Sequence, residues 1–345
     1  MRPRGRMKIY AFVLLLCVYG VVWPAWAQNV NPNPQPSPDE QIHDNFSRLT
    51  KIWLTVVDKG GKPVASLSDK DLRVLEDGVP QVIEGFAPML DVPIRLVLAI
   101  DTSLSQERVL EVTQAAAREF VEASLRPDKD RAAVFSFSGR ATLKQPLTNN
   151  LDAIKHALDD LAVEIPPGYL GGGVVVVSPP KPSKGATTPG STSIWDAIAA
   201  IDQQVFATPS ADARRVIILL TDGQDTASRL NKNDAIERTI KAGVVVYAIG
   251  IGSEEYGGVD KGTLLKLAER TGGRAFFPKK SGELRAAFAQ IQQELRMQYL
   301  LVYKPKNVVP EDKYRKLQIE IINPELRKQK IELAYPQGCF YTPAP

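Results

Sequence analysis

Four nearly continuous apolar runs constrain the fold of this chain most strongly. They read IRLVLAI, AAVFSF, VIILL and VVVYAIGI, at residues 94–100, 132–137, 216–220 and 244–251. Such runs are typical of strands that are covered on both faces, as in a parallel sheet between two layers of helices. The intervening segments repeat apolar residues at intervals of three and four, which is the period of an amphipathic helix. The region therefore predicts an α/β fold with a doubly wound, mainly parallel sheet.

Short strand-like segments stand on both sides of this region. Before it come IWLTVVD and LRVLEDG, with a hairpin expected at Asp77-Gly78, and after it come QYLLVYKP, RKLQIEII and QKIELAYP. Each group alone is too short to bury much of a core. We therefore expect both flanking segments to meet in one small β-module, with the α/β domain inserted between them.

The start of the chain has the layout of an export signal. Four basic residues at positions 2–8 precede the apolar stretch 9–23, and Ala25-Trp26-Ala27 fits a small-x-small cleavage site. This layout predicts a secretory signal peptide that is cut after Ala27. The alternative, an uncleaved membrane anchor, needs a longer apolar span of roughly 20 residues. We expect an exported protein of the periplasm, cell envelope or extracellular space, with no integral membrane segment after cleavage.

The expected organisation has five parts: the signal peptide at 1–27, a flexible Pro- and Asn-rich linker at 28–48, β segments at 49–90 and 297–345, and the α/β domain at 92–296. Without the four basic residues of the leader, 39 basic residues face 39 acidic ones. A formally neutral chain has no global field to attract nucleic acid or anionic lipid, so neither is expected as a partner.

Cysteine usage excludes a disulfide within the exported chain. Cys17 lies in the leader, which leaves Cys339 as the single cysteine after cleavage. We predict that Cys339 is a small buried apolar residue and that the core alone stabilises the fold.

Five oxygen-bearing side chains are expected at one edge of the sheet. Asp101, Ser103 and Ser105 form a D-x-S-x-S pattern after the first apolar run, Asp222 follows the third, and Thr192 opens a helix. Ligands of open α/β sheets bind beyond the carboxyl ends of the strands, so both carboxylates should emerge at the same rim. Two carboxylates and three hydroxyls suit a hard divalent cation such as Mg²⁺. Neutral hydroxyls leave the ion attractive to an external carboxylate, which predicts a metal-bridged binding site for the acidic group of a partner.

Each piece of this pattern also has a simpler interpretation. Asp101 and Thr192 could cap helices, the first of them beginning near Gln106, and Asp222-Gly223 could form an ordinary turn. Asp225 is near enough to support the ligands, although a role as a turn former is favoured, and Asp196 is predicted to cap or pair locally.

A long Gly- and Pro-rich insertion, residues 164–191, enters directly before Thr192. Loops of this length inside a compact domain are usually functional or disordered. A functional loop beside the metal and a mobile insertion of no consequence both remain open.

The ordered set of these five residues resembles the metal-ion-dependent adhesion site of von Willebrand factor type A domains, over about residues 92–296. The wider chain is similar to exported bacterial proteins related to that domain, through segments 56–86 and 294–305. The resemblance implies that the five residues bind Mg²⁺ or Mn²⁺ and that an Asp or Glu of a partner protein or peptide completes the coordination shell. Two positions depart from the family pattern, since Leu104 and Ser191 stand where glycine is usual.

Enzymatic readings find little support. The general acid of a haloacid-dehalogenase-type phosphatase would fall at Ser103, and the two histidines, His43 in the linker and His156 on a predicted helix, are poorly placed for serine hydrolysis. The sequence contains no P-loop and no H-E-x-x-H motif. We therefore expect no enzyme. The alternative to a metal-dependent binding protein is a cell-envelope scaffold in which the metal is structural or vestigial.

Overall fold

The computed structural model describes residues 49–170, 190–207, 213–307 and 313–340. The predicted signal peptide and linker lie outside the described residues, as do residues 171–189 of the insertion. Within the described residues, no helix has both the length and the apolar character needed to cross a bilayer.

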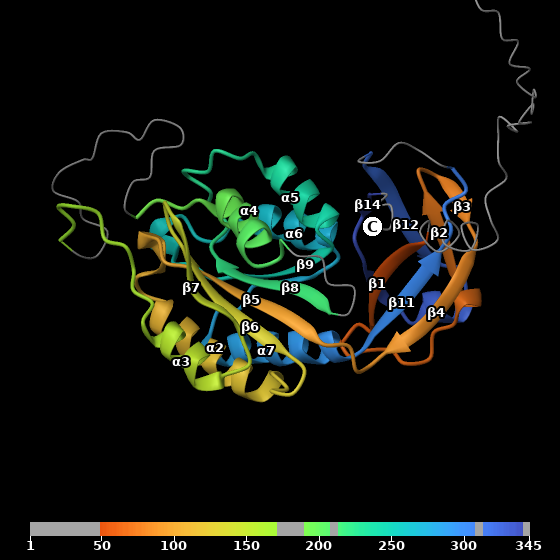
Figure 1. The fold of residues 1–345 in the computed structure, drawn as a ribbon, viewed down its shortest axis with the longest axis horizontal. Helices are drawn as coiled ribbons and strands as arrows, with labels where there is room; N and C mark the ends of the chain where they lie inside the picture. The colour runs from red at the N-terminus through yellow and green to blue at the C-terminus, as the bar shows by residue number, and fades with distance from the viewer. Residues whose placement is uncertain (1–48, 171–189, 208–212, 308–312, 341–345) are drawn as a thin grey trace, which may run out of the picture. The chain divides into compact units, whose positions relative to one another are not determined.

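A six-stranded sheet forms the centre of the α/β domain, in the order β10-β9-β8-β5-β6-β7 (Figure 1). All neighbouring strands pair in parallel except β6 and β7, which are antiparallel. Four of the strands are the apolar runs, which confirms the doubly wound, mainly parallel sheet. The bounds are β5 (Ile94–Asp101), β6 (Arg131–Phe137), β7 (Ala141–Thr148), β8 (Arg214–Thr221), β9 (Val244–Gly250) and β10 (Ala275–Phe276).

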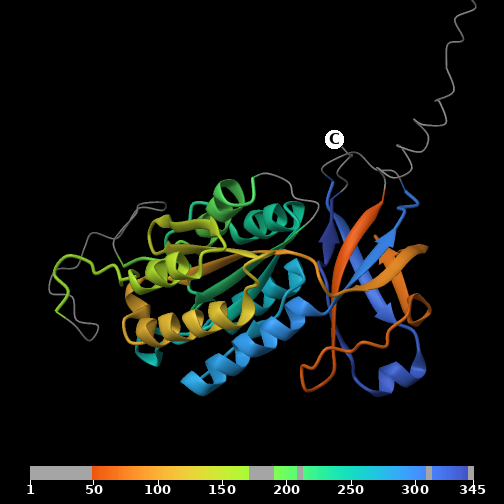
Figure 2. The same ribbon diagram turned by 60° about the horizontal axis from the view of Figure 1, so that its bottom comes forward.

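Helices cover both faces of this sheet, as Figure 2 shows. Alternate side chains of β5 point to opposite layers, because successive residues of a strand face opposite sides. Leu96 and Leu98 join a core with α2, α3 and α7, whereas Val97 and Ala99 join a second core with α4, α5 and α6. The helices are α2 (Leu110–Ser124), α3 (Leu151–Asp159), α4 (Ile194–Gln204), α5 (Lys232–Lys241), α6 (Lys261–Thr271) and α7 (Ser281–Arg296).

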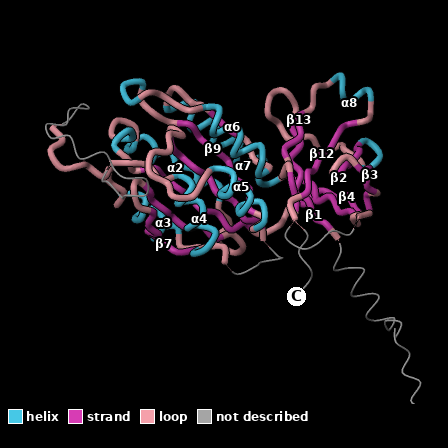
Figure 3. Tube along the Cα trace, turned by 90° about the horizontal axis from the view of Figure 1, so that it is seen from above, coloured by secondary structure: helices cyan, strands magenta, loops and turns pink. Residues whose placement is uncertain are grey.

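Two four-stranded sheets form the β-module, in the orders β13-β1-β11-β4 and β14-β12-β2-β3 (Figure 3). Both sheets contain strands from before and after the α/β domain, which alternate in the first sheet and form two adjacent pairs in the second, and the two sheets share one apolar core. The expected meeting of the two flanking segments is therefore confirmed, while their boundaries at residues 90 and 297 stay a prediction. The strands are β1 (Thr50–Val57), β2 (Leu72–Glu76), β3 (Val79–Gln81), β4 (Ile83–Met89), β11 (Gln298–Tyr303), β12 (Arg315–Ile321), β13 (Glu332–Ala334) and β14 (Gly338–Cys339).

Short elements complete the fold. Three 3-10 turns, η1 (Asp69–Asp71), η2 (Leu104–Gln106) and η3 (Glu254–Tyr256), and the short helix α8 (Pro324–Lys328) lie in connections. The expected hairpin joins β2 to β3, and both residues of its turn have positive φ, 49° at Asp77 and 81° at Gly78. Two consecutive positive φ angles are what a two-residue type I′ hairpin requires.

A buried ion pair lies inside the β-module. Arg315 contacts Glu76 at 2.8 Å, and the side chains are 1% and 3% exposed. The hydroxyl of Tyr303 donates to the other carboxylate oxygen of Glu76 at 2.5 Å. Cys339 is a buried free cysteine beside this group, as predicted. Both carboxylate oxygens of Glu76 therefore have a donor, which offsets part of the cost of removing the charge from water.

A buried arginine joins the β-module to the central sheet. Arg214, the first residue of β8, donates to the backbone carbonyls of Leu295 and Met89, and its guanidinium lies 4.7 Å from the ring centroid of Trp53. Burial lowers the pKa of Arg214 to about 10. One side chain thus links β8, the end of α7 and two strands of the β-module.

We predict that Glu76→Ala lowers the free energy of unfolding by about 3–5 kcal/mol, because it removes the carboxylate that pairs with the buried guanidinium of Arg315. Urea denaturation followed by circular dichroism measures this change. Glu320→Ala is the matched control, since Glu320 pairs with Arg73 on the same two strands at the exposed surface and should cost at most about 1 kcal/mol. Equal losses in both variants would contradict the prediction.

Candidate metal centre

Asp101 ends β5 with its carboxylate buried and fully engaged. The side chain is 1% exposed; the backbone N–H of Ser103 donates to Oδ1 at 2.9 Å, and the hydroxyl of Thr221 donates to Oδ2 at 2.6 Å. Thr221 is the last residue of β8, the strand next to β5. The parallel pairing of the two strands therefore places a donor beside the carboxylate. Sequence reasoning missed Thr221, because a threonine at the end of an apolar run is typical of any strand.

Ser103 and Ser105 lie in the turn that follows β5, which we call the serine turn. Their hydroxyl oxygens are 3.1 Å apart, and the side-chain amide of Gln106 donates to Ser105 at 3.2 Å and to the carbonyl of Ile251 at 3.3 Å. The helix expected to begin near Gln106 begins instead at Leu110. Hydrogen bonds between residues three apart, such as Gln106 N–H to the carbonyl of Ser103 at 3.0 Å, close a 3-10 turn there first.

Asp222 meets the serine turn from the end of β8. It is 2% exposed, and its Oδ1 accepts from the backbone N–H of Gln224 at 2.9 Å. Burial raises the pKa of Asp222, and the Ser105 hydroxyl and the Gln224 N–H oppose the rise. Hydrogen bonds therefore link Asp101, Ser103 and Ser105, and the charge of Asp222 acts on Asp101.

The two carboxylates form an electrostatically unfavourable pair. Burial raises the pKa of Asp101 to about 7, hydrogen bonds from Ser103 and Thr221 lower it, and the charge of Asp222 raises it further. Among the described residues, neither carboxylate has a lysine, arginine or histidine within ion-pair distance. Buried charges are normally paired or bound to a metal. A divalent cation between these oxygens fits the electrostatics of the group.

Thr192 reaches the same end of the sheet through its backbone. Its N–H donates to the hydroxyl of Thr226 at 2.8 Å, and its carbonyl accepts from the N–H of Thr226 at 2.9 Å. Two residues earlier, the carbonyl of Gly190 accepts from the N–H of Leu104, in the serine turn, at 3.3 Å. Thr192 is 4% exposed. The structure thus ties this segment to both loops that carry the other four residues, and its role as a ligand stays a prediction.

Asp225 and Asp196 hold the surrounding loops. Asp225 accepts from the N–H of Ile194 at 2.7 Å and from the hydroxyl of Ser228 at 2.5 Å, so it holds the start of α4 directly after Thr192. Asp196 accepts from the N–H of Leu230 at 2.9 Å. The expectation of local pairing for Asp196 was wrong, because this hydrogen bond joins α4 to the loop after β8.

Leu104, which replaces the usual glycine, faces the returning end of the insertion. A Cβ added to Gly190 would lie 3.4 Å from the Cβ of Leu104 and 3.1 Å from Cδ of Pro166, and Gly190 has φ +84°. At the other end of the insertion, the N–H of Glu164 donates to the carbonyl of Thr102 at 2.8 Å. Both described ends of the insertion therefore contact the serine turn. Its central part, residues 171–189, is outside the described residues.

The donor set distinguishes this group from other metal sites. Among the residues that the structure describes, no cluster of three or more His, Cys, Asp or Glu is arranged to hold a metal ion. Zinc and copper sites depend mainly on the nitrogen of histidine and the sulfur of cysteine, and neither residue type is among the five predicted ligands. Carboxylate and hydroxyl oxygens instead favour a hard cation.

Comparison with solved structures finds similar folds at low sequence identity. Proximal thread matrix protein 1 from the mussel byssus is 22% identical with a TM-score of 0.48, over 64% of this chain and 51% of that chain. A second structure of the same mussel protein has a zinc-occupied MIDAS motif. This chain thus spans about half the length of the mussel protein.

Two bacterial structures are also similar. BatB from Bacteroides thetaiotaomicron is 18% identical with a TM-score of 0.43, over 58% of this chain and 98% of that one. A von Willebrand factor type A protein from Catenulispora acidiphila is 13% identical with a TM-score of 0.46, over 86% and 74%.

Sequence comparison identifies the domain. No protein with a curated description matches the chain significantly. Two family models, both described as the von Willebrand factor type A domain, match residues 96–224 and 185–292. Their matches overlap and together span β5 to α7, the sheet and helices that carry the candidate metal centre. The chain therefore contains a von Willebrand factor type A domain.

Proposed function

We propose that this protein is an exported binding module in which a divalent metal, Mg²⁺ or Mn²⁺, joins the domain to an acidic group of a partner protein. Asp101, Ser103, Ser105, Thr192 and Asp222 would hold the ion. The bound metal supplies positive charge and open coordination positions for a carboxylate from outside. The family to which the domain belongs and the donor chemistry both support this role.

The observation that carries the proposal is the convergence of two buried carboxylates that pair with no cationic side chain in the part of the chain that the structure describes. Asp101 ends β5 and Asp222 directly follows β8, the neighbouring parallel strand. A purely structural pair would be expected to contact an arginine or lysine, as Glu76 and Glu294 do elsewhere in the molecule. The group is therefore suited to an ion that the chain itself does not provide.

Export and the absence of enzymatic activity belong to the same proposal. The basic, apolar and small-residue layout of residues 1–27 supports export. His156 lies exposed on α3, where it would not serve as a general base for the serine turn that follows β5. Binding is therefore the role that we propose.

We predict that Asp101→Asn and Asp222→Asn each weaken Mg²⁺ or Mn²⁺ binding by more than about 100-fold, because changes outside the first coordination shell already cost roughly 10- to 100-fold. Isothermal titration calorimetry of the purified protein measures this affinity. Asp202→Asn is the matched control: burial raises the pKa of Asp202, on α4, to about 7, yet no role at the metal is assigned to it. Unchanged uptake in all three variants would rule out the proposed centre.

Thr221→Val is predicted to weaken metal binding by about 10-fold while keeping the fold, since it removes the donor that orients Asp101. Thr239→Val is the matched control, because Thr239 is equally buried and donates to Asp202 at 3.2 Å. The same titration, with thermal melts of both variants, separates affinity from stability. If both variants bind Mg²⁺ like the unaltered protein, the hydroxyl of Thr221 does not position the site.

Partner capture distinguishes the binding module from the scaffold alternative. With the purified protein as bait in an envelope extract, we expect the captured proteins to be retained in Mg²⁺ and lost in chelator or with Asp101→Asn. The measurement is quantitative mass spectrometry, with Asp202→Asn as the matched bait. Capture that survives both chelator and Asp101→Asn would favour a scaffold in which the metal is structural or vestigial.

A further inference from the structure

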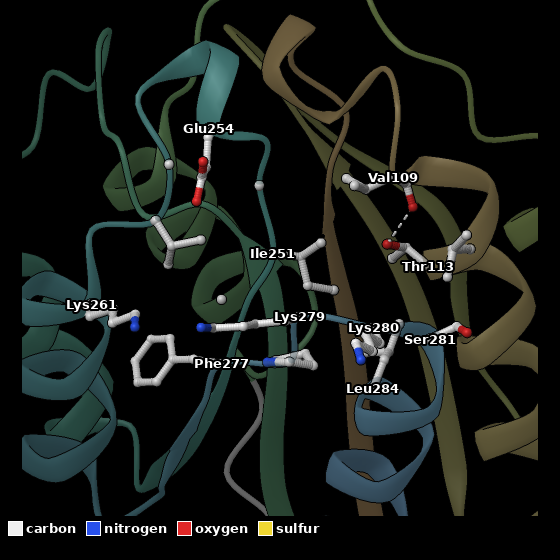
Figure 4. A pocket seen from close by; sticks show the side chains of 16 residues that line it. Val109, Thr113, Ile251, Glu254, Lys261, Phe277, Lys279, Lys280, Ser281 and Leu284 are labelled. Atoms are coloured by element: carbon white, nitrogen blue, oxygen red, sulfur yellow. Dashed lines mark hydrogen bonds between the residues drawn. The ribbon is translucent and has the colours of Figure 1, made fainter.

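A pocket opens beside the candidate metal centre. It has a volume of about 650 Å³, within the range of small-molecule sites. Its walls come from the end of β9 and the loop that follows, the starts of α2 and α6, and the connection from β10 into α7. Figure 4 shows these walls and the side chains that line them.

The pocket and the metal centre share a wall. Gly252 lines the pocket, and a Cβ added to it would lie 2.7 Å from the Cβ of Asp222. Ile251 also lines the pocket, and its carbonyl accepts from the same Gln106 amide that donates to Ser105. A ligand held at the metal therefore lies next to the pocket, separated from it by these backbone segments.

Three lysines give the pocket an unbalanced positive charge. Lys261, Lys279 and Lys280 line it, all three are exposed, and none forms an ion pair among the described residues. In Figure 4 the side chains of Lys261 and Lys279 point toward one another across the lower part of the pocket. Both ammonium groups would attract a bound anion.

Acidic groups near the pocket compensate this charge only in part. Glu254 lines the upper wall. Glu283, in the first turn of α7, accepts from the backbone N–H of Lys279 at 2.8 Å. No side chain caps the start of this 16-residue helix, so its free N–H groups add positive partial charge near Lys280. The balance among these groups still favours an anion.

The remaining walls are apolar. Val109, Val112, Ile251, Phe277 and Leu284 line the pocket, and Lys261 Nζ lies 5.5 Å from the ring centroid of Phe277. Apolar walls with a few charged groups suit a carboxylate on a short hydrocarbon stem, as in glutamate, better than a small, strongly hydrated inorganic anion.

We propose that this pocket, through Lys261, Lys279 and Lys280, binds a second acidic side chain of the same partner segment whose first carboxylate binds the metal. The inference rests on the proposed function and deepens it, because it defines the ligand as a peptide with two spaced acidic residues. Tethering makes the second binding event intramolecular and raises the overall affinity without any further contact.

The pocket is tested first without the metal. Glutarate is titrated into the metal-free protein, and the amide signals of Gly250, Gly252 and Leu284 are followed by NMR. We expect saturable shifts, and an affinity at least about 10-fold weaker in Lys261→Ala/Lys279→Ala. Lys266→Ala, an exposed lysine on the outer part of α6, is the matched control and should bind like the unaltered protein. If no signals shift, or if all variants bind glutarate equally well, the proposal that the lysines of this pocket bind a carboxylate is wrong.

The second test joins the two sites. We compare the affinities of acetylated peptides for the protein, with Mg²⁺ in 10-fold excess over the protein. One set has two glutamates separated by zero to five glycines, and the reference peptide has one glutamate. At the best spacing we expect at least about 10-fold tighter binding than for one glutamate, and loss of this gain in the double lysine variant. If glutarate binds but the two-glutamate peptides bind no more tightly than the one-glutamate peptide, the proposal that one partner segment occupies both sites is wrong.

The two failures can be told apart. If the metal centre is wrong, Mg²⁺ uptake fails but Asp101→Asn still binds glutarate through the lysines. If instead the pocket does not bind the second carboxylate, the protein still takes up Mg²⁺ and still binds the one-glutamate peptide, and the lysine substitutions change neither.

Discussion

The burial of two like-charged carboxylates at the end of neighbouring parallel strands is the constraint around which this end of the sheet is built. Asp101 and Asp222 are almost fully removed from water, and each would be costly without donors. Thr221, Ser103 and Gln224 provide these donors from positions fixed by the strands themselves. The hydrogen bonds hold the carboxylates but do not neutralise them, so the remaining charge is the property that a metal would use.

Long-range backbone contacts bring the third part of the centre into place. Thr192 comes from a helix start far along the chain, and Thr226 binds its backbone in both directions. Asp225 then holds the next turn by accepting from Ile194. The TDGQDT segment at the end of β8 therefore has two roles: its first aspartate is a predicted metal ligand, and its second holds the start of α4, two residues after Thr192. The favoured reading of Asp225 as a structural residue fits this arrangement.

The sequence predicted the parts of the fold whose signals are local. Apolar runs buried on both faces gave β5, β6, β8 and β9, and Asp77-Gly78 gave its hairpin. Strand β7 was missed, because it is an antiparallel edge whose alternating pattern includes Lys144 and Pro146, and edge strands tolerate such residues. Thr221 was missed for a different reason. Its role depends on which strand lies next to β8, and no single-sequence pattern contains that pairing.

Charge distribution ties the metal centre and the pocket into one argument about recognition. Apart from the predicted leader, basic and acidic residues are balanced, so attraction for an acidic partner is not expected to come from net charge. It must come from local groups, whose fields are screened within about 8–10 Å at physiological salt. Asp101 and Asp222, which would hold the metal, and the lysines around Phe277 lie on two sides of the Ile251–Gly252 backbone. A partner would therefore be selected by the spacing of its acidic groups, since a diffuse negative charge would gain little from either.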